Sequence, residues 1–147
     1  MRRPSERVDH HLRQLGVICS AMLMGVVVLG GIVWYLLNSG GFTPPEGMPG
    51  FSAILFNLVA LVAIVKTLFL PRLFPPPTEG APEEELLAWH QRTTIVGFAL
   101  REAAALTALV GVMLTGQQVG GFAMAGLALV AMVLAWPRLE QLQNPRP

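Results

Sequence analysis

Residues 15–37 read LGVICSAMLMGVVVLGGIVWYLL and contain no charged side chain. A helix rises 1.5 Å per residue, so about 20 apolar residues cross the ~30 Å hydrocarbon core of a bilayer. Trp34 and Tyr35 stand near the end of this stretch, and aromatic rings of this kind favour a membrane interface. The 23 residues exceed the roughly 7 to 15 apolar residues of a signal-peptide core. They therefore predict a membrane-spanning helix.

Three further apolar blocks follow along the chain, at residues 51–70, 93–115 and 120–136. Of the 147 residues, 53% are hydrophobic and only 13% are charged, and the mean hydropathy is +0.56. This composition excludes an ordinary soluble enzyme, a secreted disulfide scaffold and a disordered tail. We expect an all-α polytopic membrane protein whose four transmembrane helices form two antiparallel hairpins.

Polar or helix-breaking segments separate the four blocks. Proline lacks an amide donor and clashes with a continuing helix, so Pro71 should end the second span at residue 70. Three glutamates after Pro82 suit the positive end of a helix dipole, and they predict that the third helix starts outside the bilayer. The predicted connecting segments are a cytoplasmic arm at residues 1–14, an external loop at 38–50, a cytoplasmic linker with the helix start at 71–92, an external turn at 116–119 and a cytoplasmic tail at 137–147.

The basic residues predict the orientation of these spans. Nine of the ten lie in the arm, in the tail, or in the linker and its flanks, whereas the two opposite loops contain none. Because basic residues are enriched on the cytoplasmic side, we expect a multi-pass protein of the bacterial inner membrane with both termini in the cytoplasm. Aromatic, basic and imidazole side chains near the span ends are the expected interfacial anchors to membrane lipids: Trp34, Tyr35, Lys66, Arg72, Trp89, His90, Arg92, Trp136 and Arg138.

Arg101 and Glu102 stand inside the third apolar block. A charged side chain at the bilayer centre costs ~2.5–3.5 kcal/mol on insertion scales and is usually kept by a partner or by water. Glu102 lies ten residues beyond Arg92, which is roughly 15 Å of helix rise and close to mid-bilayer. Adjacent helical residues point about 100° apart, so each charge can instead meet another polar group, such as Asn57 or Thr107.

Three roles remain open for Arg101 and Glu102. They can act as a structural clamp between helices. Glu102 can bind a proton or line an ion path, since desolvation favours a neutral carboxyl group unless Arg101 stabilises its charge. Contact with a lipid headgroup or another ligand is the third role.

The other polar groups predict no further chemistry. A net charge of +1 provides no basic excess for nucleic acid. His10 and His11 lack the cysteine or carboxylate spacing of a metal site, so we expect neither a metal nor a cofactor. No nucleophile stands in a catalytic motif with a base, so we do not expect an enzyme. The cysteine and the small residues of the last two helices are expected to pack: Cys19, Gly97, Ala104, Ala108, Gly111, Gly121, Ala125, Ala128 and Ala135.

The segment RTTIVGFALREA, residues 92–103, resembles the carboxylate-bearing helix of the ring proteolipid, subunit c, of rotary ATP synthases. In that family the glutamate binds the transported proton, so the resemblance implies this role for Glu102. Arg101 stands where that family has an apolar residue, and no repeated Gly-x-Gly helix precedes the segment. The layout as a whole, with its ending Trp136-Pro137-Arg138, is similar to a group of uncharacterised small bacterial four-helix membrane proteins, which implies a topology but no activity.

Taken together, these patterns predict a non-enzymatic accessory or structural subunit, acting as an oligomer of itself or attached to a larger bacterial membrane complex. The small mass outside the predicted spans favours this function. The expected partners are membrane lipids and either other membrane-protein subunits or further copies of the chain. Two alternatives remain, a proton-binding or channel-like proteolipid that uses Glu102 and, with less support, a small transporter.

Overall fold

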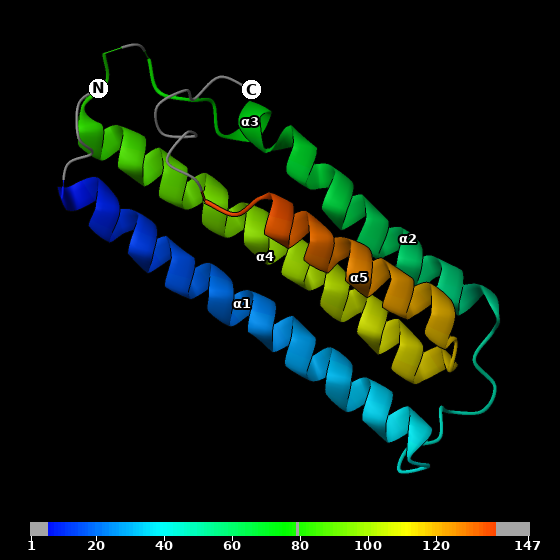
Figure 1. Cartoon of the computed structure of the whole chain (residues 1–147). Coiled ribbons are helices and arrows are strands. Elements are labelled where there is room, and N and C mark those ends of the chain that lie inside the picture. Colours follow the sequence, from blue (N-terminus) through cyan, green and yellow to red (C-terminus); the bar gives the residue numbers. More distant parts are fainter. Residues whose placement is uncertain (1–5, 79, 138–147) are drawn as a thin grey trace.

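The computed structural model describes residues 6–78 and 80–137, and it arranges them as a bundle of four main helices (Figure 1). No strand occurs among these residues, so the all-α prediction is confirmed for the part of the chain that the structure describes. The elements in chain order are α1 (Glu6–Asn38), α2 (Phe51–Lys66), the 3₁₀ turn η1 (Thr67–Phe69), α3 (Leu70–Leu73), α4 (Glu83–Thr115) and α5 (Gln118–Leu134).

Three helical segments are long and apolar enough to cross a membrane. They are Val8–Asn38, Phe51–Leu73 and Glu83–Thr115. The fourth helix, Gln118–Leu134, is apolar but shorter, with 17 residues. Three of the four predicted spans therefore have the length and composition that a membrane crossing requires.

Helix α4 lies in the middle of the bundle and packs against α1, α2 and α5 (Figure 1). Helices α1 and α2 run in opposite directions, but they lie on different sides of α4 and share little contact. The first predicted hairpin is therefore not a packed pair of helices. Its connection, residues 39–50, is long enough to carry the chain past α4 before α2 begins.

Two helix boundaries differ from the sequence expectation. Helix α1 begins at Glu6, so much of the predicted polar arm is helical. Pro71 does not end the second apolar segment, which continues through η1 and α3 to Leu73. Pro71 falls within the first two positions of α3, and proline is tolerated there because that amide needs no intrahelical acceptor.

Small residues let α2 and α5 approach α4 closely. A Cβ atom on Gly111 would lie 2.7 Å from Cβ of Phe56 on α2. A Cβ atom on Gly121 of α5 would overlap Val112 and lie 3.0 Å from the carbonyl oxygen of Ala108. The predicted packing residues of α4 and α5 are buried apart from Ala135, which is half-buried, so the prediction of close helix packing is confirmed for these contacts.

Helix α1 is attached to α4 through a narrow stripe. Its buried apolar side chains are Leu15, Cys19, Val26 and Val33, which recur at intervals of four and seven residues along one face. The predicted packing role of the cysteine is confirmed, because Cys19 joins Phe98 of α4 in one buried cluster.

Candidate functional site

Arg101 and Glu102 are both half-buried near the middle of α4, and they face different neighbours. Adjacent residues of a helix are rotated by about 100°, which separates the two side chains on the helix surface. No ion pair joins them, and neither side chain has a hydrogen-bond or ion-pair partner within the described residues. The two charges therefore do not neutralise each other.

The Arg101 side chain turns back along α4 toward the helix start. Its Nη1 atom lies 3.0 Å from the position that a Cβ on Gly97 would take, one turn earlier. Leu70 of α3 approaches the same position, with its Cδ1 atom at 3.2 Å. Gly97 thus leaves the space that both side chains use, and the guanidinium points toward the same end of the bundle as the start of α4. Its Nε atom is buried and has no hydrogen-bond partner in the part of the chain that the structure describes.

The Glu102 side chain faces α1. Its Oε1 atom lies 3.9 Å from the position of a Cβ on Gly25, an α1 glycine. Gly25 has no side chain to occupy this part of the α1–α4 contact. The carboxyl group therefore lies against the α1 helix, at the edge of the packed stripe.

The two polar residues proposed as partners lie elsewhere or make no such bond. Asn57 lies beside α5, where its Nδ2 atom is 3.1 Å from the position of a Cβ on Gly120. Thr107 is half-buried on α4 and donates no hydrogen bond to either charge. The structure does not bring Asn57 or Thr107 together with Arg101 and Glu102.

Several of the expected anchors are exposed on the bundle surface. Trp34 and Tyr35 lie near the end of α1 with 58% and 64% of their surface exposed. Lys66 ends α2, and Arg92 lies on the outer face of α4. The guanidinium of Arg72 lies over the ring of Phe69 at 5.5 Å, a cation–π contact. Arg138 lies outside the described residues.

The other two tryptophans turn inward. The indole Nε1 of Trp89 donates a hydrogen bond of 2.9 Å to the carbonyl oxygen of Phe74, which ties α4 to the segment after α3. Trp136 packs edge-on against the buried Phe98 ring, with 6.3 Å between ring centroids. Both residues therefore serve the internal packing of the bundle.

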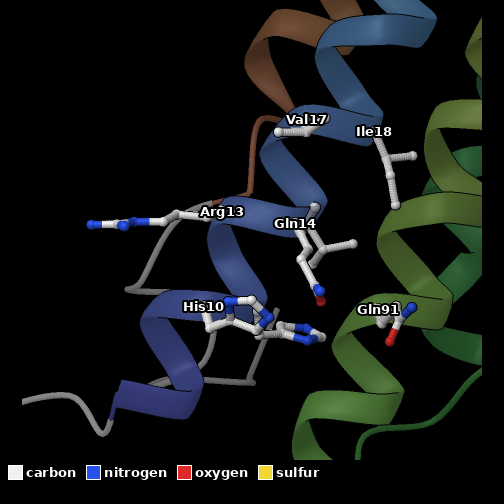
Figure 2. Close-up of a pocket in the computed structure, with 8 residues that line it drawn as sticks. His10, Arg13, Gln14, Val17, Ile18 and Gln91 are labelled. Atoms are coloured by element: carbon white, nitrogen blue, oxygen red, sulfur yellow. The ribbon is translucent and has the colours of Figure 1, made fainter.

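His90 and His11 form a contact that was not predicted from the sequence. His90 is 3% exposed, and its ring lies 6.0 Å from the ring of His11 on α1, measured between centroids. A cleft of about 540 Å³ adjoins this pair between α1 and α4 (Figure 2). Its polar lining residues are His10, His11, Arg13, Gln14 and Gln91.

A signal for this pairing was present in the sequence. His11 stands shortly before the first apolar block, and His90 stands shortly before the third. The first and third helices of an up-and-down bundle run in the same direction, which places their starts at one end. The contact still depends on the rotation of each helix, because a quarter turn would carry either ring to the surface.

No model of a known protein family, no curated protein and no solved structure matches this chain.

Proposed function

We propose that this chain is a non-enzymatic, multi-pass protein of a bacterial inner membrane, with both termini in the cytoplasm, and that it acts as an accessory or structural subunit of a larger membrane complex. Three features support the proposal. They are the apolar outer faces of the helices, the positions of the lysine and arginine residues along the chain, and above all the charged side chains of Arg101 and Glu102, which have no partner within the described chain.

The outer faces of α1, α2 and α5 carry large apolar side chains, which suit lipid better than water. A soluble monomer rarely exposes contiguous apolar patches larger than a few hundred Å². Here such side chains occur along the lengths of three helices, and the most exposed of them are Val17, Phe51, Ile54, Val119 and Leu134. A hydrocarbon environment removes the cost of this exposure.

Arg101 and Glu102 carry the argument for a partner. At membrane depth each charge costs ~2.5–3.5 kcal/mol unless another group compensates it. The chain supplies no ion pair to either residue within its described part. A polar helix from another subunit, or from a second copy, would provide the missing partner and would make assembly favourable.

The test is photo-crosslinking of the tagged, full-length chain in its native membrane. A photoreactive residue at Ala103, which is exposed beside Glu102, should crosslink to one stoichiometric membrane protein. Replacing Glu102 by Gln should lower both the crosslinking yield and the co-purification in mild detergent about tenfold, the scale of one lost hydrogen bond to a charged group.

Matched variants separate a specific loss from general damage. Glu85→Gln removes the same charge from the exposed first turn of α4, and a photoreactive residue at Val119 probes the exposed start of α5. Neither change should lower the co-purification of the partner. Recovery of the chain as a monomer, or a Glu102→Gln variant that keeps its partner in full, would contradict the proposal.

A second function is favoured by one observation, the position of Glu102 against α1. A carboxyl group that lies beside a glycine of a neighbouring helix, with no ion pair to Arg101, is placed to bind and release a proton. A proton-binding or channel-like proteolipid, as the resemblance of residues 92–103 implies, would use it in this way.

Carbodiimide labelling tests this second function, because the reagent attacks a protonated carboxyl group. Labelling should occur at Glu102, should fall as the pH is raised, and should be absent from the Glu102→Gln variant. The solvated Glu85 provides the comparison within the same helix. Absence of labelling at Glu102 in the folded protein would rule this function out and would leave the accessory-subunit proposal intact.

A further inference from the structure

The cleft between α1 and α4 changes from polar to apolar along the helix axis. His10, His11 and Gln14 line its first part, together with Gln91 of α4. Leu15, Val17 and Ile18 line the part that follows along α1, where the uncharged segment of this helix begins. The change in the cleft lining therefore coincides with the predicted border between headgroups and hydrocarbon.

The polar part of the cleft holds hydrogen-bonding groups that face an unfilled space. Gln14 extends from α1 toward α4, and Gln91 lies on α4 at the other side of the cleft (Figure 2). The Nε2 atom of His11 is buried and has no hydrogen-bond partner among residues 6–78 and 80–137. A buried nitrogen of this kind costs free energy until a ligand satisfies it.

The charges around the polar part favour an anion. Arg13 lines the cleft and points away from α4 (Figure 2), and Arg92 is exposed on α4 next to Gln91. A long arginine side chain can turn toward a bound phosphate, for which its guanidinium fork is suited. Asp9 is exposed on α1 next to His10 and would oppose an anion.

We propose that this cleft binds one anionic phospholipid, with the phosphate group among His11, Gln14 and Gln91 and an acyl chain along Val17 and Ile18. The inference rests on the proposed membrane location, and it is independent of the partner proposed for Glu102. An amphiphile fits this cleft because the polar and apolar parts of the lining follow each other along one helix.

The test uses the full-length protein reconstituted with equal amounts of phosphatidylglycerol and phosphatidylcholine, purified in mild detergent and examined by native mass spectrometry. The wild-type chain should retain one phosphatidylglycerol in preference to phosphatidylcholine. His11→Phe keeps an aromatic ring but removes both ring nitrogens, and Gln91→Leu removes the side-chain amide of α4. Each variant should lower the retained phosphatidylglycerol about tenfold.

Two further variants make the test specific. Gln117→Leu repeats the glutamine change at the N-cap of α5 and should leave lipid retention unchanged, because the start of α5 lies at the opposite end of the bundle from the start of α1 (Figure 1). Asp9→Asn should increase the retention of phosphatidylglycerol, since it removes the opposing charge, whereas a cation site would be weakened by this change. The circular dichroism of each variant confirms that it is folded.

Several outcomes would overturn the inference. These are full retention of lipid by both His11→Phe and Gln91→Leu, equal retention of the two lipids, and binding of inorganic phosphate in place of lipid. Carbonate extraction of the starting membranes tests the membrane location by itself, and co-purification through Glu102 tests the partner. A failure of the lipid cleft is thereby distinguished from a failure of the proposed function.

Discussion

The two sides of α4 are packed in different ways. Toward α2 and α5, Gly111 and Gly121 bring the helices so close that an added Cβ would overlap a neighbouring side chain. Toward α1, the contact is a narrow stripe, and Gly25 leaves open space beside Glu102. This second contact also adjoins the cleft that His11 and Gln91 line.

Because of this difference, we expect stability and binding to depend on different sides of α4. A contact without free space fixes the distance between helices and contributes dispersion energy along its whole length. A contact with polar groups and open space contributes less, but it can admit a ligand or respond to a partner. We therefore expect stability to depend mainly on the α2–α4–α5 side and binding on the α1–α4 side.

Gly121→Ala should cause the largest loss of stability. The new methyl group would overlap Val112, so α4 and α5 would have to separate, at a cost of about 2 kcal/mol in the free energy of unfolding. Denaturant titration of the purified protein in detergent measures the change. Gly126→Ala on the same helix meets no atom within 4 Å and should be neutral or stabilising, so equal losses in both variants would contradict this account.

Trp89→Phe should cost less, about 1 kcal/mol, because it removes one hydrogen bond while keeping an aromatic ring. The lost bond joins the indole to the Phe74 carbonyl oxygen and ties α4 to the segment after α3. Limited proteolysis should therefore cut between residues 74 and 82 faster in this variant. Unchanged cleavage would show that other contacts hold this segment.

Gly97→Ala should perturb Arg101, and the effect should depend on the length of that side chain. A Cβ atom would lie 3.0 Å from Nη1 of Arg101 and 3.2 Å from Cδ1 of Leu70. We expect a coupling of about 0.5–1 kcal/mol between Gly97→Ala and Arg101→Ala in a double-mutant cycle of unfolding free energies. If the effects of the two substitutions were strictly additive, the Arg101 guanidinium would not contact a side chain at position 97.

Gly25→Ala should have the smallest effect, within about 0.5 kcal/mol in the free energy of unfolding. The methyl group would lie 3.9 Å from Oε1 of Glu102, an ordinary contact, and alanine favours the helix over glycine. If the same titration gave a loss of unfolding free energy as large as that of Gly121→Ala, the two sides of α4 would be equally closely packed, which would contradict the expected difference between them.

Much of the fold follows from the sequence because its causes are local. The apolar block at residues 15–37 predicts a long helix, and the glutamates after Pro82 predict the start of α4, which begins at Glu83. The small residues of α4 and α5 are buried as expected, because only small side chains allow two helices to approach this closely.

The lateral arrangement and much of the site do not follow from local patterns. The order of the helices along the chain does not determine which of them lies in the middle of the bundle. The contact of His11 with His90 depends on the rotation of two helices that are far apart in the sequence. The sequence predicted that Arg101 and Glu102 lie inside a long apolar helix, which α4 confirms, whereas the direction of Arg101 depends on the space that Gly97 leaves.

The central position of α4 has a consequence for the order in which the protein is made. Helices α1 and α2 are synthesised first, yet they share little contact, and the helix that connects them in space comes third. When α1 and α2 have been synthesised, α4, the helix against which both of them pack, has not yet been made. We therefore expect the helices to assemble once residues 83–115 have been translated, and the close packing of α5 against α4 to stabilise the arrangement afterwards.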